Sequence, residues 1–512
     1  MAESHHSPEV SGVDRVIHPK KDCSLYLAAD SLVISDRLLT KRSQANFCGW
    51  RFGSSTTKIT IPYYNILWAS VDKELVIEWA QEDDDKFYKR KNPDSKLNYV
   101  KMHYPVGEDS TLVLKWAEKL LQLAYGRAHL QKRALVLVNP KAGPGKAVEI
   151  FEQDVRPLFE AARMRLTVRR TSRGGEGMDI CRNLDITDYD VVVVCSGDGL
   201  AYEVFNGFGA RRDAGIALKK VAVAHIPCGS GNALGANLNG FSHPSPSALA
   251  IIKGIPTPID LMSVTQGTQR TLSFLSQSVG IIAECDLGTE NMRWLGAKRF
   301  DVGIVQRIWR KRLYPCDVAF KLELDDKDDI KSHYRDYQAR VAEGDKPSGD
   351  DTQRPSSSRG GTQGGLPPLR FGTVHDEVPD DWEKHNFDKM GSFYCGKMPY
   401  MTAKACFFPA ACPEDGLMDV AMNDGDIRKR DYIPLMQSVE SGNFFDNPLL
   451  SYRKVAAYRF TPRNQPTGYI SIDGERVPFE PFQVEVHSGL GTVLSRRGRY
   501  ECNGPPDWER VA

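Results

Sequence analysis

Three glycine-rich turns in the first half of the chain combine residue types that suit phosphate binding, over residues 139–147, 196–200 and 227–233. Each turn follows a short apolar run, LVLVN, DVVVVC or VAVAHIP, which is typical of a parallel strand buried on both faces. Glycine lets backbone N–H groups approach a phosphate, and a following helix N-terminus adds partial positive charge. Because turns after parallel strands meet at one sheet edge, the three together predict a polyphosphate site.

Asp198 is the only carboxylate in these three turns. Phosphoryl transfer to an alcohol is mostly positioning and charge neutralisation, and a carboxylate beside the phosphates can orient the hydroxyl and accept its proton. The alternative is a loop aspartate that caps the next helix through its side-chain oxygens. The position between two glycines, opposite two further phosphate turns, favours the catalytic interpretation.

Two familiar nucleotide-binding motifs are excluded, one by its residue types and the other by its spacing. The first turn is no Walker A loop, because it has Pro140 where that loop has glycine and Ala147 in place of the Mg²⁺-binding Ser or Thr. The third turn runs Gly229-x-Gly231-x-x-x-Gly235, which is one residue too long for the dinucleotide fingerprint. An ordinary P-loop enzyme and a plain Rossmann dehydrogenase are therefore not expected.

The elements that position these turns predict a chain of class α/β plus all-β. Strands alternating with helices predict a Rossmann-like α/β nucleotide-binding domain over residues 133–262. Strand-rich sequence with one helical stretch at 289–313 predicts an antiparallel sandwich or barrel over 263–495. A low-complexity tract at about 341–368 lies in an insertion predicted to be disordered over about 326–388.

The ends of the chain carry weaker signals. Residues 1–19 are predicted to be a disordered N-terminus, and residues 496–512 a C-terminal tail. Between residues 20 and 127, several strands are followed by an amphipathic helix at 111–126, an order that resembles a pleckstrin-homology-like β module. The alternative is a small β-domain that only packs on the rest. If the module acts, we expect membrane recruitment or regulation.

Composition excludes several classes of protein. The 67 Lys and Arg balance 66 Asp and Glu to a formal charge of +1, which gives no global attraction to nucleic acid, and no basic stripe with interleaved aromatics appears. The 11 cysteines include no C-x-x-C pair, so we expect reduced thiols rather than a disulfide framework or a zinc site. No apolar run approaches the ~18 residues of a membrane span, and the N-terminus does not read as a signal peptide. We expect a soluble intracellular multidomain protein without a protein-held metal.

Several motifs together resemble a known family. NPKAGPGKA, SGDGLAYEVFNG and IPCGSGNALGANL resemble the three motifs of the diacylglycerol-kinase-type lipid kinases. GSGNALGANL, GIIAECDLGTENMRWLGAKRF and SIDGE are similar to the sphingosine (long-chain-base) kinases in particular. The resemblance covers about residues 133–490 apart from the insertion. It implies that the antiparallel domain over residues 263–495 is a β-sandwich that binds lipid. It also implies ATP-dependent phosphorylation of the primary hydroxyl of sphingoid bases, with ATP and Mg²⁺ as cofactors.

The resemblance also implies roles for individual residues. Asp198 matches the family's catalytic carboxylate, Asp286 the residue that binds the sphingoid amine and hydroxyl, and Ile281 and Ile282 precede it where they can line an apolar tail pocket. The residues that match nucleotide contacts are Asn139, Pro140, Lys141, Gly143, Gly145, Lys146, Thr171, Arg173, Ser196, Gly197, Gly199, Glu203, Gly229, Ser230, Gly231, Asn232, Arg293, Arg299, Asp473, Gly474 and Glu475.

Asp286 decides the expected substrate class, because a sphingoid base carries an ammonium whereas diacylglycerol and ceramide do not. A carboxylate ~4 Å from an ammonium is worth at most ~4 kcal/mol at an effective dielectric near 20. Burial of ~15 tail methylenes at ~0.8 kcal/mol each adds up to ~12 kcal/mol. A diacylglycerol or ceramide kinase and an inactive lipid- or nucleotide-binding regulator remain the alternatives.

We expect a cytoplasmic enzyme that binds intracellular or plasma membranes peripherally. The sequence leaves open whether it forms a homodimer.

Overall fold

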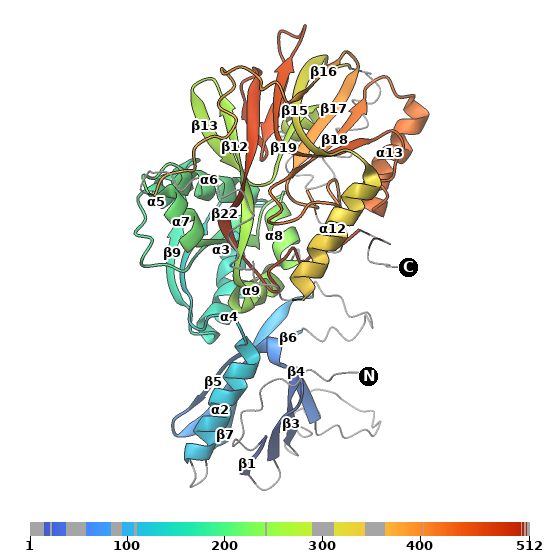
Figure 1. Ribbon diagram of the computed structural model, residues 1–512. Coiled ribbons are helices and arrows are strands. Elements are labelled where there is room, and N and C mark those ends of the chain that lie inside the picture. Colours follow the sequence, from blue (N-terminus) through green and yellow to red (C-terminus); the bar gives the residue numbers. More distant parts are fainter. Residues whose placement is uncertain are drawn as a thin grey trace. The chain divides into compact units, whose positions relative to one another are not determined.

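The computed structural model describes residues 15–20, 23–36, 58–82, 95–106, 110–240, 243–288, 312–343, 364–402, 404–502, 504–505 and 508 (Figure 1). The chain divides into two compact units. The first comprises Met1–Lys132 and Gln153–Arg165, and the second comprises Arg133–Glu152 and Leu166–Ala512.

In its described residues the first unit contains two antiparallel sheets and two α-helices. One sheet has the order β1 (Val16–Lys20), β2 (Cys23–Leu27), β3 (Ser31–Asp36), β4 (Lys58–Pro62), and the other has the order β5 (Ile66–Val71), β6 (Glu74–Glu82), β7 (Leu97–Pro105). Helix α2 (Ser110–Tyr125) buries Trp116, Leu120 and Ala124, which recur every four residues on one face. Strands followed by an amphipathic helix match the predicted element order. The disorder predicted for residues 1–19 is wrong from Val16, because β1 pairs with β2.

Part of the predicted nucleotide domain belongs to this first unit. Residues 153–165 include α4 (Arg156–Ala161), which contacts β5, β6 and β7. Just after α4, the Arg163 guanidinium forms an ion pair with the buried carboxylate of Glu78 on β6. Helical periodicity locates such a helix in the sequence, but it does not reveal which strands the helix packs against.

The second unit begins with the predicted parallel strands. β8 (Arg133–Val138), β10 (Val191–Ser196) and β11 (Ala222–Pro227) pair in parallel, and β9 (Arg165–Arg170) lies at the edge of the sheet beside β8. Every residue of β10 and β11 is buried, which explains their unbroken apolar sequences. The helices that alternate with these strands are α3 (Ala147–Ile150), α5 (Glu176–Arg182), α6 (Asp198–Gly209), α7 (Ala214–Lys220), α8 (Ala233–Asn239) and α9 (Pro244–Lys253).

The rest of the second unit is built mainly from antiparallel strands around a common core. Phe393, Tyr458 and Phe482 are fully buried there. The ring of Tyr458 contacts both phenylalanines, tilted against Phe393 and edge-on to Phe482. The strands are β12 (Ile255–Gln266), β13 (Gln269–Ser273), β14 (Ser276–Gly280), β15 (Cys316–Leu324), β16 (Glu383–Phe387), β17 (Met390–Gly396), β18 (Met418–Asp424), β19 (Ser451–Pro462), β20 (Ile470–Ile472), β21 (Glu475–Val477) and β22 (Phe482–Ser495). The described helices are α10 (Ile281–Gly288), α12 (Lys327–Ala342) and α13 (Lys429–Ser441).

The parallel and antiparallel parts share one continuous 15-stranded sheet. Strand β22 pairs in parallel with β11 at Val493 and Val223, and antiparallel with both β12 and β19. The predicted boundary between residues 262 and 263 falls inside β12, so it marks no break in the structure. Two long strands that run through both parts cannot be recognised as shared from local composition.

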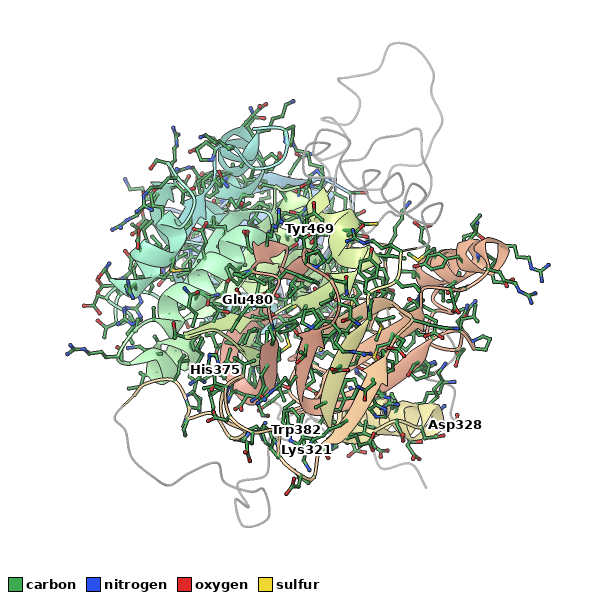
Figure 2. All side chains as sticks on the ribbon, turned by 90° about the horizontal axis from the view of Figure 1, so that it is seen from above. Lys321, Asp328, His375, Trp382, Tyr469 and Glu480 are labelled. Atoms are coloured by element: carbon green, nitrogen blue, oxygen red, sulfur yellow. The ribbon has the colours of Figure 1, made fainter. Side chains whose placement is uncertain are left out.

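The disorder predicted for residues 326–388 is wrong for the two segments of it that are described. Asp326 caps α12 by accepting the N–H groups of Asp328 and Asp329, and the helix buries Ile330, Tyr334 and Tyr337. Further on, Trp382 is only 3% exposed and packs edge-on against Phe371; Figure 2 labels Trp382 and Asp328. Charged residues lower the mean hydropathy of α12, although its apolar residues recur at helical intervals. Residues 344–363 lie outside the described residues, as do residues 289–311 of the predicted helical stretch.

Candidate functional site

The three glycine turns touch one another through their backbones. A Cβ atom on Gly229 would lie 2.3 Å from Cα of Gly197, and one on Gly197 would lie 2.7 Å from the carbonyl oxygen of Gly231. Gly143 has φ +53°, and a Cβ there would lie 2.6 Å from the carbonyl oxygen of Cys228. No side chain fits at these three glycines, because the atoms opposite them are backbone. This close approach confirms that the turns meet at one edge of the sheet.

Hydrogen bonds hold the strand ends that carry these turns. The Asn139 N–H donates to the carbonyl of Cys195 at 3.1 Å, and the Cys228 N–H donates to that of Ser196 at 3.0 Å. Thr171, which is buried, donates its N–H to the carbonyl of Val138 at 2.9 Å, so the end of β9 lies at the same edge. The carboxyl ends of four neighbouring strands therefore surround the turns.

The first turn is open to solvent. The Asn139 Oδ1 accepts the N–H of Lys141 at 3.0 Å, which closes the turn locally. Gly145 follows with φ +80°. Lys141 and Lys146 are both exposed, so the first turn presents two cations beside its glycines, as a phosphate-binding loop requires.

Asp198 is the first residue of α6 and is held by another helix. Its carboxylate accepts the N–H groups of Ala233 at 2.8 Å and of Leu234 at 2.9 Å, both at the N-terminus of α8. Its own N–H donates to the carbonyl of Gly231 at 3.2 Å. The capping interpretation therefore describes a real contact, although the capped helix is α8 rather than α6. A carboxylate has about four lone-pair sites, so the two backbone bonds leave acceptor capacity for a substrate hydroxyl.

Two predicted nucleotide contacts hold the protein's own backbone. Glu203 accepts the N–H groups of Gly175 at 2.9 Å and Gly177 at 2.8 Å, which orders the start of α5. Asn232 accepts the N–H of Gly229 at 2.9 Å and donates its amide to the carbonyl of the same residue at 2.8 Å. Both side chains shape the site around the turns.

A third predicted nucleotide contact, Arg173, lies just before α5 in the chain. Its guanidinium is more than half exposed and forms an ion pair with Asp179, one helical turn into α5. A cavity of about 460 Å³ borders this pair. Its other lining residues are Arg169, Glu176, Ile180, Asn183, Leu184, Asp185, Asp188 and Tyr189. Four carboxylates against two arginines make this cavity a poor phosphate site.

The loop at 473–475 is anchored by Asp473, which is 3% exposed. Its carboxylate accepts the Oγ–H of Ser273 at 2.6 Å. It also accepts three backbone N–H groups, from Phe274, Leu275 and Ser276, at 2.9 to 3.0 Å. Burial raises the pKa of this carboxyl to about 6, against the effect of those donors. Asp473 thus fixes the loop from inside the protein.

The same loop lies between the start of α6 and Asp286. A Cβ on Gly199 would lie 3.3 Å from Oε1 of Glu475, and one on Gly474 would lie 3.9 Å from Oδ2 of Asp286. The Ser471 Oγ–H donates to that same Oδ2 at 3.0 Å. The structure therefore brings together the glycine turns, the late acidic residue and the predicted substrate carboxylate.

Comparison with known proteins agrees with this geometry. Residues 133–264 match the model of the diacylglycerol kinase catalytic domain, and residues 15–126 match a domain of unknown function. Sphingoid long chain base kinase 4 of Schizosaccharomyces pombe is 33% identical over 462 residues, which cover 88% of this chain and 92% of that protein. The chain belongs to the sphingoid long-chain-base kinase family.

Further relatives carry related names. Sphingoid long chain base kinase 5 of Saccharomyces cerevisiae is 33% identical over 426 residues, covering 75% of this chain. The match spans 62% of that yeast protein's length. Sphingosine kinase 1 of Arabidopsis thaliana is 28% identical, with 76% of this chain and 80% of that protein covered.

The two isoleucines predicted to contact the tail of a lipid substrate lie in different parts of the core. Ile281 is buried in the core of the antiparallel strands, whereas Ile282 is half-buried and packs against a second cluster that contains Tyr394 and Phe408. Their shared contact with one tail stays a prediction. Arg293 and Arg299, predicted to reach the phosphates, lie outside the described residues.

The carboxylates at the turns fit a Mg²⁺ ion that arrives on the nucleotide. No cluster of three or more His, Cys, Asp or Glu side chains that suits a metal occurs among the described residues. Asp198 already binds two backbone N–H groups, and Glu475 lies beside Gly199. Mg²⁺ in kinase sites typically uses one or two carboxylates together with substrate phosphates and water, which this arrangement can supply.

One structural residue of the site was missed by sequence reasoning. Asn237 on α8 is fully buried, and its side-chain amide exchanges two hydrogen bonds with the backbone of Tyr400, at 2.7 and 2.9 Å. It thereby ties the helix that holds Asp198 to the antiparallel part. An asparagine in NALGANLNG carries no distinguishing signal, since its partner lies 163 residues away.

No helix among the described residues is both long and apolar enough to cross a membrane.

Proposed function

We propose that this protein transfers the terminal phosphate of ATP to the primary hydroxyl of a sphingoid long-chain base, such as sphingosine, dihydrosphingosine or phytosphingosine. The product is the 1-phosphate. The observation that carries the proposal is the position of Asp198, at the meeting point of the three glycine turns and one residue before Gly199, which lies beside Glu475. Such a site joins phosphate binding to a carboxylate that can receive a hydroxyl proton.

On the nucleotide side, backbone N–H groups at Gly143, Gly197, Ser230 and Gly231 would cradle the phosphates, with Lys141 and Lys146 nearby. Gly229, whose own N–H is accepted by Asn232, would let the backbone come close to them. Mg²⁺ bound to the nucleotide, with Glu475 as a protein carboxylate to hold it, would neutralise phosphate charge. Arg173, just before α5, would contact the nucleotide away from its phosphates, because carboxylates surround its side chain.

On the acceptor side, Asp198 would orient the hydroxyl and accept its proton as the new O–P bond forms. A carboxylate is too weak a base to deprotonate an alcohol beforehand, so proton transfer must accompany phosphoryl transfer. The two N–H groups of α8 fix the carboxylate's orientation, which is the kind of positioning that this reaction depends on.

Asp286 would select the charged head group. Its carboxylate is partly exposed and is oriented by Ser471 at 3.0 Å. An ammonium ~4 Å away gains up to ~4 kcal/mol at an effective dielectric near 20, and a neutral lipid gains none of it. Ile281 and Ile282 lie in the same helix and would border the tail.

The lipid substrate requires contact with a membrane. We place the protein in the cytoplasm, peripherally and transiently bound to an intracellular or plasma membrane. The first unit, with the seven strands among its described residues and helix α2 after them, would be the pleckstrin-homology-like module that assists this contact. A β-sandwich made of the antiparallel strands would hold the lipid tail. Whether the enzyme forms a homodimer is a separate question, which gel filtration answers.

Labelled-phosphate transfer to sphingosine, ceramide and diacylglycerol tests the proposal. We expect the sphingoid base alone to be labelled, and Asp198→Asn to retain ATP binding but lose turnover. Labelling of diacylglycerol or ceramide in preference would indicate the other lipid-kinase activity. ATP binding without any transfer would indicate an inactive regulator.

A further inference from the structure

His225 is a buried titratable group that the proposed reaction does not use. It lies in the middle of β11, in the run VAVAHIP, and only 1% of its surface is exposed. The residues on either side, Ala224 and Ile226, are buried apolar residues. An imidazole in such a position requires hydrogen-bond partners for both ring nitrogens.

Both partners are backbone groups next to the glycine turns, one at the end of β10 and one in the first turn of α8. The Nε2 atom lies 2.9 Å from the carbonyl oxygen of Ser196, and the Nδ1 atom lies 3.0 Å from the backbone nitrogen of Gly235. A backbone N–H can only donate, so Nδ1 must be the acceptor and Nε2 must carry the proton. The ring therefore bridges the end of β10 to the first turn of α8 as a neutral imidazole.

Gly235 is the residue that admits this bridge. A Cβ atom there would lie 3.1 Å from Nδ1 of His225, closer than most side chains tolerate. This contact gives a role to the third glycine of the Gly229-x-Gly231-x-x-x-Gly235 pattern, which phosphate binding leaves unexplained.

The bridge completes a closed set of contacts around Asp198. The first three N–H groups of α8 are divided between two side chains: those of Ala233 and Leu234 bind Asp198, and that of Gly235 binds His225. His225 then bonds Ser196, two residues before Asp198. The imidazole thus fixes the separation between the strand that carries the carboxylate and the helix that orients it.

Burial keeps the bridge in one form. It lowers the pKa of His225, although the nearby Asp198 carboxylate acts in the opposite direction. A protonated ring would also point an Nδ1–H at the Gly235 N–H.

We propose that His225 is a positioning residue for Asp198: its neutral imidazole, held between the Ser196 carbonyl and the Gly235 N–H, sets where the carboxylate stands relative to the acceptor hydroxyl. The inference rests on the proposed function. His225 touches no reacting group itself, so its loss should lower turnover and leave nucleotide affinity largely intact.

Two substitutions divide the bridge into its halves. In His225→Asn the side-chain oxygen replaces Nδ1 as the acceptor for Gly235, and in His225→Gln the side-chain nitrogen replaces Nε2 as the donor to Ser196. Each variant keeps one bond and frees the other. A displacement of about 1 Å costs up to about 100-fold in turnover, so we expect kcat for sphingosine to fall 10- to 100-fold in each. The Kd for ATP, measured by direct binding, should change less than threefold.

The matched control is His487→Gln, which alters another buried histidine, on β22, that bonds Ser263 and not the glycine turns. We expect its kcat to stay within twofold of wild type. Gly235→Ala perturbs the same bridge from the helix side and serves if the His225 variants do not fold. Combining Gly235→Ala with His225→Gln should cost no more than the larger single effect, because both act through one bridge.

The outcomes separate the two proposals. A wild-type protein that phosphorylates no sphingoid base refutes the proposed function. An active wild type whose His225 and Gly235 variants keep their kcat refutes the positioning role alone. The positioning role is also refuted if the fall in kcat comes with an equal loss of ATP affinity. It is refuted likewise if the kcat of His487→Gln falls as much.

Discussion

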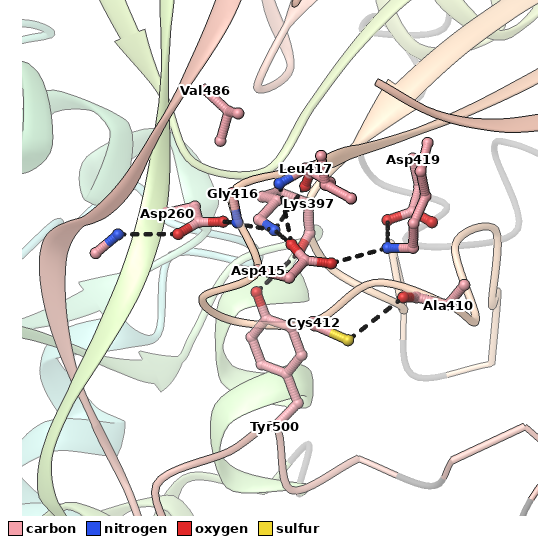
Figure 3. A network of polar contacts seen from close by, with 12 residues as sticks. Asp260, Lys397, Ala410, Cys412, Asp415, Gly416, Leu417, Asp419, Val486 and Tyr500 are labelled. Carbon is pink, nitrogen blue, oxygen red and sulfur yellow. Dashed lines mark hydrogen bonds and ion pairs between the residues drawn. The ribbon is translucent and has the colours of Figure 1, made fainter. Parts of the chain in front are cut away.

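Lys397 lies in a buried charge network whose loss should have a large, measurable cost (Figure 3). The ammonium is fully buried and lies 2.7 Å from Oδ2 of Asp260; it also forms an ion pair with Asp415 and donates to the carbonyl of Leu417 at 2.6 Å. Lys454, equally buried, bonds Asp415 at 3.0 Å and Asp419 at 3.1 Å. Two buried ammoniums are thus shared among three buried carboxylates.

Substituting Lys397→Met would remove one ammonium and leave Asp260 and Asp415 partly uncompensated. Breaking a buried ion pair by removal of one partner costs ~3–5 kcal/mol. That free energy corresponds to a rise of roughly 10² to 10⁴ in the unfolding equilibrium constant, at ~1.4 kcal/mol per tenfold. The physical cause is desolvation, because the carboxylates stay buried while their counter-ion is gone.

Urea unfolding followed by tryptophan fluorescence measures this change in the free energy of unfolding. The control is Lys321→Met. The ammonium of Lys321, which Figure 2 labels, lies 3.0 Å from a carboxylate oxygen of Asp381, and the Asp381 side chain is 63% exposed. A surface pair of this kind contributes ~0–1 kcal/mol. If Lys397→Met destabilised the protein no more than the Lys321 control, the buried pairing would be refuted.

Three further predictions concern the carboxylate proposed to bind the lipid head group, a glycine contact and a buried histidine. Asp286→Ala should raise the KM for sphingosine at least tenfold and leave that for ATP unchanged in steady-state kinetics, and an equal rise for both would contradict its assignment to the lipid. Gly229→Ala should weaken ATP binding at least tenfold by direct titration, because its Cβ would lie 2.3 Å from Cα of Gly197, and native affinity would argue against the contact between the turns. Burial, with two arginines nearby, lowers the pKa of His487 from 6.5 to about 3, so the fold holds it neutral. Its contribution to the free energy of unfolding is complete above pH 6.5 and declines as the pH falls toward 3, by ~2 kcal/mol at pH 5. Between pH 7.5 and pH 5, the free energy of unfolding should therefore fall by ~2 kcal/mol more in the wild type than in His487→Gln. Equal falls in the two proteins would exclude the effect.

Motifs with local geometry could be predicted from the sequence. The turns around Gly143, Gly197 and Gly229 were expected at one sheet edge, because parallel strands with buried apolar runs place their carboxyl ends together. Asp198 was recognised for the same reason. The sequence did not show that both its oxygens bind backbone N–H groups of α8, since a cap normally lies at its own helix.

Features that depend on distant partners could not be predicted. Nothing in VAVAHIP distinguishes His225 from a core residue, because its partners lie 10 and 29 residues away in the chain. Helix α12 was assigned to a disordered insertion because its charges hide the apolar spacing of Ile330, Tyr334 and Tyr337. The continuous sheet through β12 and β22 was missed because strand pairing across more than 200 residues leaves no local trace.

The most direct test of the central claim is transfer of labelled phosphate from ATP to sphingosine, with ceramide and diacylglycerol in parallel and Asp198→Asn as the inactive control. We predict labelled product from sphingosine with the wild-type protein, little or none from the two neutral lipids, and none from the Asp198→Asn variant although it still binds ATP. Equal labelling of diacylglycerol and sphingosine, or near-native activity of the variant, would contradict it.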